Sequence, residues 1–179
     1  MIIVRNPDGT ENEAGIDKLR ELIYRRIALV ASELVQPVQD AEQSDWEMPS
    51  IFDSPDTLRL MCLMSGGQVR NLMQLIQRAI DYIDELPITK KAAKKSIAAM
   101  RDTYRQTVQP HQWEILARIH HTKESNNDAE HLRLLRSRCL LEYKKYNDDN
   151  DDMDVWCNVH PLIEKIPKFK EALSKVQST

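Results

Sequence analysis

Only four glycines occur in this chain of 179 residues, at Gly9, Gly15, Gly66 and Gly67, and their scarcity limits the sites that the chain can build. A phosphate-binding loop needs the spacing G-x-x-x-x-G-K-[ST], and a dinucleotide-binding turn needs G-x-G-x-x-G. Neither spacing occurs in the sequence. The chain is therefore not a self-contained nucleotide hydrolase of those kinds, and we expect no catalysis from it alone.

Charge and cysteine content further limit the kind of protein that this chain can be. Lys plus Arg number 25 and Asp plus Glu number 28, a formal net charge of −3, which excludes a uniformly basic nucleic-acid-binding surface but not a local basic patch. Three cysteines (Cys62, Cys139 and Cys157) form no C-x-x-C pair and no convincing disulfide framework, so they indicate a reducing compartment. A charge at Arg5 comes too early for a signal peptide, and no apolar run approaches about 18 residues. We expect a cytoplasmic protein without a membrane segment.

Residues 1–14 contain a short predicted strand with nothing beside it. Ile-Ile-Val at residues 2–4 is followed by the turn-forming Asn6-Pro7-Asp8-Gly9, and a strand this short needs a sheet to join. No second strand follows nearby in the sequence. This unpartnered strand is a first indication that the chain begins partway through a larger fold.

Residues 15–108 predict a bundle of four helices. Apolar residues recur at helical spacing from Ile16 until just before Pro37, and a polar loop over residues 37–52 follows. Ser54 is a typical N-cap for a second helix, which ends at the Gly66-Gly67 pair. A third helix begins directly after these glycines, and a fourth is capped by Thr89.

Residues 109–179 predict a winged-helix domain. One helix is expected around Trp113, and a second is expected to begin at the N-cap Asn127. The inward side chains of this second helix are predicted to be Leu132, Leu135 and Cys139. Segments 141–146 and 154–159 alternate like paired strands around an Asn-Asp turn, and the tail after Pro161 predicts one or two short helices. Trp113, Tyr143 and Trp156 are predicted to form the core of this unit.

Several stretches resemble the helical lid of AAA+ ATPases, most closely the initiator and STAND-like branch in bacteria. Residues 61–72 (MCLMSGGQVRNL), followed by Gln77-Arg78-Ala79, resemble the second-sensor segment of that lid. Residues 19–26 resemble the first lid helix, and Leu86-Pro87-Ile88-Thr89 resembles the start of the last one. Residues 155–162 (VWCNVHPL) resemble the end of the winged helix that follows the lid.

The resemblance implies a nucleotide-binding core that these 179 residues do not contain, because the Walker motifs are missing. It implies that the chain is the C-terminal part of a longer ATPase, either a fragment or a split subunit, with ATP and Mg²⁺ bound only by the missing core. Residues 1–14 would then be the remnant of the last strand and loop of that core. The implied partners are that core and a protein contacted through the winged helix, with any oligomer formed through the parent protein.

Arg70 is the candidate nucleotide-sensing residue, and Gly66 and Gly67 form the turn that would place it. The glycines permit a sharp reversal, after which Arg70 falls in the first turn of a helix whose amides favour anions. A guanidinium binds phosphate oxygens in a bidentate manner, and the resemblance implies that Arg70 reads the γ-phosphate of ATP. The alternative is a solvated arginine beside an ordinary glycine cap. Arg78 fits a surface or salt-bridge role.

Two basic clusters are candidates for contact with nucleic acid or a partner. The first comprises Lys90, Lys91, Lys94 and Lys95, for which the alternative is a solvated helix face with Asp81, Asp84 and Glu85 as partners within the chain. The second comprises Arg133, Arg136 and Arg138 on the helix that would enter the major groove of DNA. The wing carries five carboxylates, Asp148, Asp149, Asp151, Asp152 and Asp154, which phosphates repel, so DNA binding is possible but disfavoured.

Metal binding is not expected. The acidic wing lacks the glycine and the terminal glutamate of a calcium loop, and the five histidines and three cysteines lack repeated ligand spacing. Taken together, the predicted elements indicate a mainly α protein, in which a lid-type four-helix bundle is followed by a winged-helix domain. The resemblance implies that this module couples the nucleotide state of the ATPase to contacts with a partner. The alternatives are a winged-helix DNA-binding regulator and a protein-interaction adaptor that acts independently of nucleotide.

Overall fold

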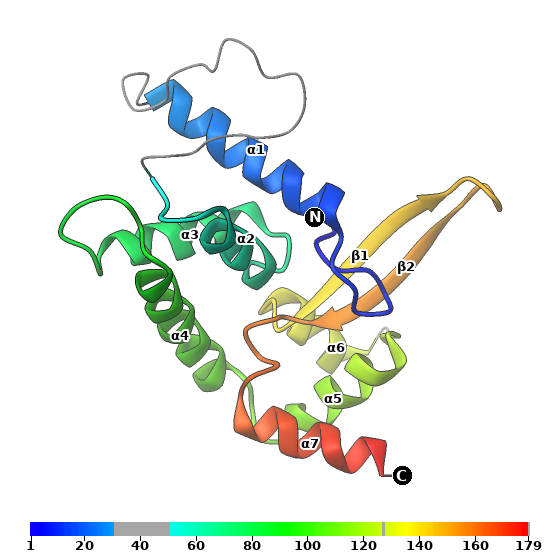
Figure 1. The fold of residues 1–179 in the computed structure, drawn as a ribbon. Helices are drawn as coiled ribbons and strands as arrows, with labels where there is room; N and C mark the ends of the chain where they lie inside the picture. The colour runs from blue at the N-terminus through cyan, green and yellow to red at the C-terminus, as the bar shows by residue number, and fades with distance from the viewer. Residues whose placement is uncertain (31–50, 127, 179) are drawn as a thin grey trace.

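The computed structural model describes residues 1–30, 51–126 and 128–178. Within these ranges the chain is mainly helical, with seven helices and one two-stranded antiparallel sheet (Figure 1). The prediction of a mainly α fold with one β-hairpin is confirmed. In chain order the elements are α1 (Glu13–Val30), α2 (Pro55–Met64), α3 (Val69–Ile80), α4 (Lys90–Thr107), α5 (Gln112–Thr122), α6 (Ala129–Arg136), β1 (Leu140–Asn147), β2 (Asp152–Val159) and α7 (Pro167–Gln177).

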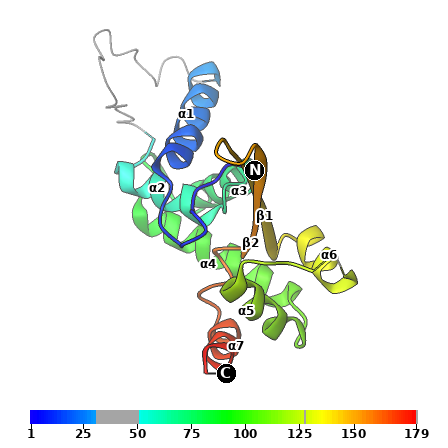
Figure 2. The same cartoon turned by 90° about the vertical axis from the view of Figure 1, so that its right-hand side faces the viewer.

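The elements form two groups that share a core (Figures 1 and 2). Helix α2 contacts α1, α3 and α4, whereas α5 contacts α7 and β2, and α6 contacts β1. The first group lies within residues 15–108 except for the start of α1, and the second lies within residues 109–179. A continuous cluster of buried apolar side chains runs through both groups, from Val4 to Ala172.

Helix starts in the first group follow the caps that the sequence predicts. Helix α2 begins at Pro55 with Ser54 at the N-cap position, although the Ser54 side chain makes no capping hydrogen bond. Helix α4 begins after Thr89, whose hydroxyl oxygen accepts the Ala92 N–H at 3.2 Å. Helix α1 begins at Glu13, slightly before the expected position. Its predicted end near Pro37 and the predicted loop up to residue 50 lie outside the described residues.

The strand predicted at residues 2–4 is wrong. Residues 2–4 instead run beside the Gly66-Gly67 turn, where the Ile2 N–H donates to the Gly67 carbonyl at 3.1 Å. The Val4 carbonyl accepts the Asn12 N–H at 3.0 Å. Because these partners come from a turn and from the loop before α1, the segment satisfies backbone groups without a neighbouring strand.

The face predicted for the second helix of residues 109–179 is wrong at Leu132, whereas Leu135 is partly buried and packs against the core. Helix α6 is capped by Asp128, whose side chain accepts the His131 N–H at 2.9 Å, while the predicted cap Asn127 lies outside the described residues. His131 and Leu134 are buried, and Leu132 is 39% exposed. The helix ends at Arg136, so Cys139 is buried from the turn that follows rather than from the helix.

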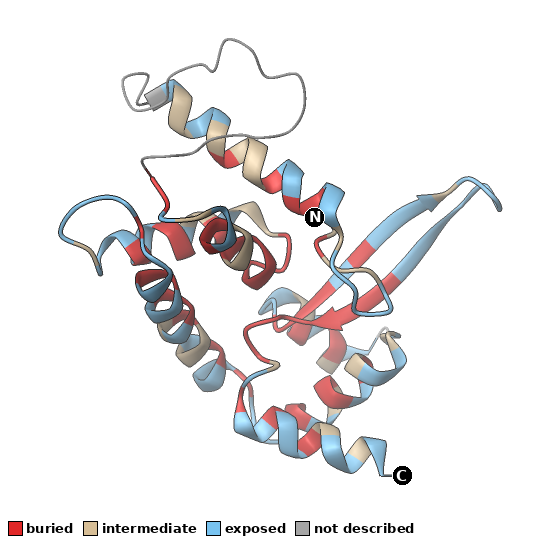
Figure 3. Cartoon of the chain, in the orientation of Figure 1, coloured by how far each residue is buried: buried red, intermediate tan, exposed pale blue. Residues whose placement is uncertain are grey.

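The hairpin has a buried half and an exposed half (Figure 3). Its register places Leu140 opposite Val159 and Asn147 opposite Asp152. We call residues 140–143 and 156–159 the hairpin base and residues 144–155 the hairpin tip. In the base, Tyr143 and Trp156 are buried and stack with ring centroids 5.5 Å apart. The predicted core positions of Trp113, Tyr143 and Trp156 are confirmed.

Candidate functional site

The Gly66-Gly67 turn lies in the interior of the protein, between helices α2 and α3 of the first group and the hairpin base. Both residues have positive φ, 64° and 79°, which side chains rarely tolerate. A Cβ on Gly67 would lie 1.7 Å from the Ile2 carbonyl oxygen, and one on Gly66 would lie 2.5 Å from Leu141 Cδ1. The sharp reversal that the sequence predicts is present, and close packing from both sides requires glycine here.

Backbone groups of this turn are engaged within the protein. The Gly66 N–H donates to the Leu63 carbonyl at 3.2 Å, and the Gly67 N–H donates to Ser65 Oγ at 3.1 Å. The Gly66 carbonyl accepts the Tyr143 hydroxyl at 3.0 Å. The turn therefore positions its neighbours and offers neither glycine amide to a phosphate.

Arg70 follows the turn, in the first turn of α3, and its side chain is exposed. Among the described residues it has no ion pair or hydrogen-bond partner. It lines an open depression of about 370 Å³ together with Met1, Gln68, Arg138 and the start of β1. Arg138 Nη1 donates to Gln68 Oε1 at 2.8 Å across this depression. The structure thus brings together Arg70 and Arg138, which the sequence placed in different units.

A buried polar network behind the turn escaped the sequence analysis. His160 is fully buried, its ring stacks on Tyr104 with centroids 4.6 Å apart, and its Nε2 lies 3.0 Å from Asn71 Nδ2. His160 Nδ1 accepts the Leu162 N–H at 3.2 Å. Burial lowers the pKa of His160 to about 3, so the ring is neutral, and burial raises the pKa of Tyr104 to about 12. The network ties α3 and α4 to the end of β2.

A second polar cluster joins the N-terminal segment to the C-terminal group. Arg5 Nη1 donates to both carboxylate oxygens of Glu164, at 3.2 and 3.0 Å, and Lys123 Nζ donates to Asn158 Oδ1 at 3.3 Å. Burial lowers the pKa of Lys123, and burial followed by the nearby Lys123 charge lowers the pKa of His120. Sequence spacing does not reveal this cluster, because its members are spread from the N-terminal loop to the segment after β2.

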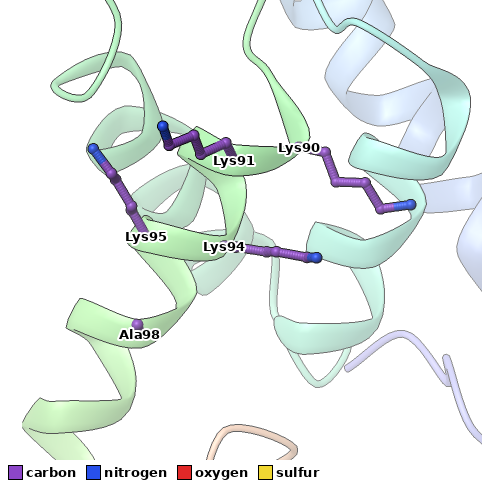
Figure 4. A pocket seen from close by; sticks show the side chains of 5 residues that line it. All are labelled: Lys90, Lys91, Lys94, Lys95 and Ala98. Carbon is purple, nitrogen blue, oxygen red and sulfur yellow. The ribbon is translucent and has the colours of Figure 1, made fainter.

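The lysine cluster lies on the first two turns of α4, over an open depression of about 500 Å³. Figure 4 shows Lys90 and Lys94 extending to one side of the helix, and Lys91 and Lys95 to the other. Lys95 Nζ lies 5.5 Å from the centroid of the Tyr82 ring, a cation–π contact. Among the described residues, none of the four ammonium groups forms an ion pair, although Asp81, Asp84 and Glu85 are close in sequence.

The second basic cluster does not lie on one helix, because α6 includes Arg133 and Arg136 but ends before Arg138. Arg133 is paired with Glu130 at 2.8 Å, and Arg138 lies after α6 with a positive φ of 59°. Arg136 is exposed at the last position of α6. A groove-reading row of all three arginines is therefore not formed.

Within the described part of the chain, no three His, Cys, Asp or Glu side chains are placed to hold a metal ion. No helix there combines the length and the apolar character that a bilayer span requires. No protein-family model, curated protein or solved structure matches this chain.

Proposed function

We propose that this chain is the lid and C-terminal module of an AAA+/STAND-like ATPase whose nucleotide-binding core lies outside these 179 residues. In this proposal α1–α4 form the lid, and α5, α6, the hairpin and α7 form the winged-helix unit. ATP and Mg²⁺ bind to the core, and the module has no catalysis of its own. Its function is to couple the nucleotide state to contacts with a partner.

The placement of Arg70 is the observation that carries this proposal. Its side chain is exposed and has no partner among the described residues, whereas the turn before it is packed against Ile2 and Leu141. A rigid turn with an available guanidinium at a helix N-terminus suits an anion presented by another domain. Arg138 adds a second positive charge beside the same depression.

The buried network gives a route by which such binding would affect the hairpin. Asn71 follows Arg70 in α3 and lies 3.0 Å from His160, which directly follows β2. Tyr143 of β1 donates to the Gly66 carbonyl in the turn itself. A shift of α3 would therefore displace both strands at the hairpin base.

Substitution of Arg70 tests the sensor role in the protein that includes the core. Arg70→Ala is expected to lower nucleotide affinity and ATP turnover by about tenfold or more, because a charge-assisted contact is lost. Arg70→Lys keeps the charge but not the bidentate geometry, so an intermediate loss is expected. The matched control is Arg78→Ala, an exposed arginine in the last turn of the same helix. Unchanged turnover and affinity in Arg70→Ala would contradict the proposal.

A nucleotide-independent adaptor is the second candidate, favoured by apolar side chains exposed on the hairpin tip. Tyr146, Met153 and Val155 are 51%, 45% and 52% exposed. An adaptor would retain a protein partner equally with and without an ATP analogue, whereas the lid would not. The acidic tip disfavours the third candidate, a DNA-binding regulator, because its carboxylates repel phosphates.

A further inference from the structure

One face of the hairpin tip gathers apolar side chains. The register places Tyr146 opposite Met153, and Lys144 opposite Val155. Because side chains alternate along each strand and paired residues share a face, these four residues lie on the same side of the hairpin. About half of the Tyr146, Met153 and Val155 surface is open to solvent, as expected of a contact surface on a projecting element.

Carboxylates lie at the end of this apolar face and on the opposite face of the tip, where Asn147 pairs with Asp152 and Lys145 with Asp154. Asp148, Asp149 and Asp151 lie in the turn, and Asp152 and Asp154 follow on β2. The Tyr146 hydroxyl donates to Asp151, which joins the apolar face to the acidic turn. None of these carboxylates forms an ion pair with a described Lys, Arg or His. The tip therefore fits a surface that is apolar and basic.

A surface of that kind lies on the connection between α3 and α4 and on the start of α4. Tyr82 and Leu86 are each 43% exposed on this connection, and the Tyr82 ring contacts Lys95 of the lysine cluster. The lysines occupy the positive end of the helix dipole, and the pairs Lys90–Lys94 and Lys91–Lys95 are like charges four residues apart. The helix dipole and the repulsion between like charges both destabilise the isolated chain. A carboxylate-rich partner would reduce both unfavourable interactions.

We infer that the protein self-associates head to tail, with the hairpin tip of one copy docked on the α3–α4 surface of the next. Figure 1 shows the two surfaces at opposite ends of the molecule, so one chain does not satisfy its own pair. Because the surfaces differ, the contact is heterologous and leads to rings or open chains. Asp81, Asp84 and Glu85 lower the net charge of the α3–α4 surface, so the association is expected to be modest and salt-dependent. The inference does not depend on the proposed nucleotide function.

Sedimentation of the wild-type chain without nucleotide is the first test. At low salt the average mass is expected to rise with concentration above the monomer mass of 20.8 kDa, and to return to it at about 0.5 M salt, where surface charges are screened. The variants Asp148→Asn/Asp149→Asn and Lys91→Gln/Lys95→Gln should each weaken association about tenfold or more. Lys168→Gln/Lys170→Gln, which removes two exposed lysines from the start of α7, should leave it unchanged. A wild-type chain that is monomeric at every concentration overturns the inference.

Mixing the two weakened variants tests the head-to-tail geometry. Each variant retains one intact surface, so the mixture should form a capped 1:1 dimer and nothing larger. Circular dichroism of each variant serves as the control for correct folding. If neither variant differs from the wild type, or if the mixture forms no dimer while the wild type assembles, the copies meet through other surfaces. Arg70→Ala should leave self-association unchanged, which keeps this test distinct from that of the nucleotide sensor.

Discussion

The two halves of the β-hairpin belong to one hydrogen-bonded ladder, yet their surroundings are opposite. In the base, Trp156 is 7% exposed and Tyr143 donates to the Gly66 carbonyl at 3.0 Å. In the tip, the neighbouring Val155 is 52% exposed, and Tyr146 donates to an aspartate of its own turn. Strand pairing is the same in both halves, so it does not decide burial. Packing against the glycine turn makes one half part of the core and leaves the other available for binding.

Adjacent residues on β2 give the sharpest test of this difference. Trp156→Ala is expected to lower the free energy of unfolding by about 3–5 kcal/mol, because a large buried ring is removed from a packed site. Val155→Ala should change it by no more than about 0.5 kcal/mol, since the side chain is exposed. Urea unfolding monitored by circular dichroism measures both. Equal losses would show that the tip contributes to stability as much as the base.

Glycine substitutions test the turn on which the base packs. Gly67→Ala should lower the free energy of unfolding by at least about 2 kcal/mol more than Gly9→Ala. Both glycines have positive φ, but a Cβ on Gly9 meets nothing within 4 Å, whereas one on Gly67 meets the Ile2 backbone. The pair therefore separates backbone strain from steric exclusion. Similar losses in the two variants, measured by thermal unfolding, would mean that Ile2 moves away easily.

The free energy of unfolding should depend on pH through His160, which directly follows strand β2 at the hairpin base. Residues of the hairpin tip should not affect this dependence. The pKa of His160 is about 3 in the folded protein against 6.5 when unperturbed, so the unfolded chain binds the proton first as the pH falls. The contribution of the neutral ring is complete above pH 6.5. Below that value, the free energy of unfolding should fall by up to about 1.4 kcal/mol per pH unit, until the pH nears the folded pKa.

The comparison of wild type with His160→Asn isolates this contribution, because His120 and the acidic groups titrate in both proteins. His160→Asn should be less stable at pH 7 but show a smaller loss between pH 6.5 and 5. Val155→Ala should retain the wild-type slope. An unchanged slope in His160→Asn would show that another group causes the pH dependence.

Sequence patterns correctly predicted the parts of the fold that depend on residues close together in the chain. The Thr89 cap, the proline start of α2 and the two paired strands each depend on neighbours within a few residues, although burial along β2 does not alternate as predicted. The cap of α6 and the burial of Leu132 were mispredicted, because a shift of one residue rotates a helix face by about 100° and packing selects the rotation. The strand expected at residues 2–4 failed for a related reason, since the partner of Ile2 lies in a turn more than 60 residues away.

The candidate site likewise combines features that the sequence predicts with features that only the packed fold creates. The sequence by itself determined that no phosphate-binding loop is present, that a glycine pair reverses the chain before Arg70, and that the hairpin turn is acidic. Only the tertiary structure decided that the turn is buried under the hairpin base, that Arg138 lies beside Arg70, and that His160 bridges α3 and α4. Residue type and spacing set local conformation and charge. Which surfaces become interior depends on contacts between distant segments, and these form only when the whole core packs.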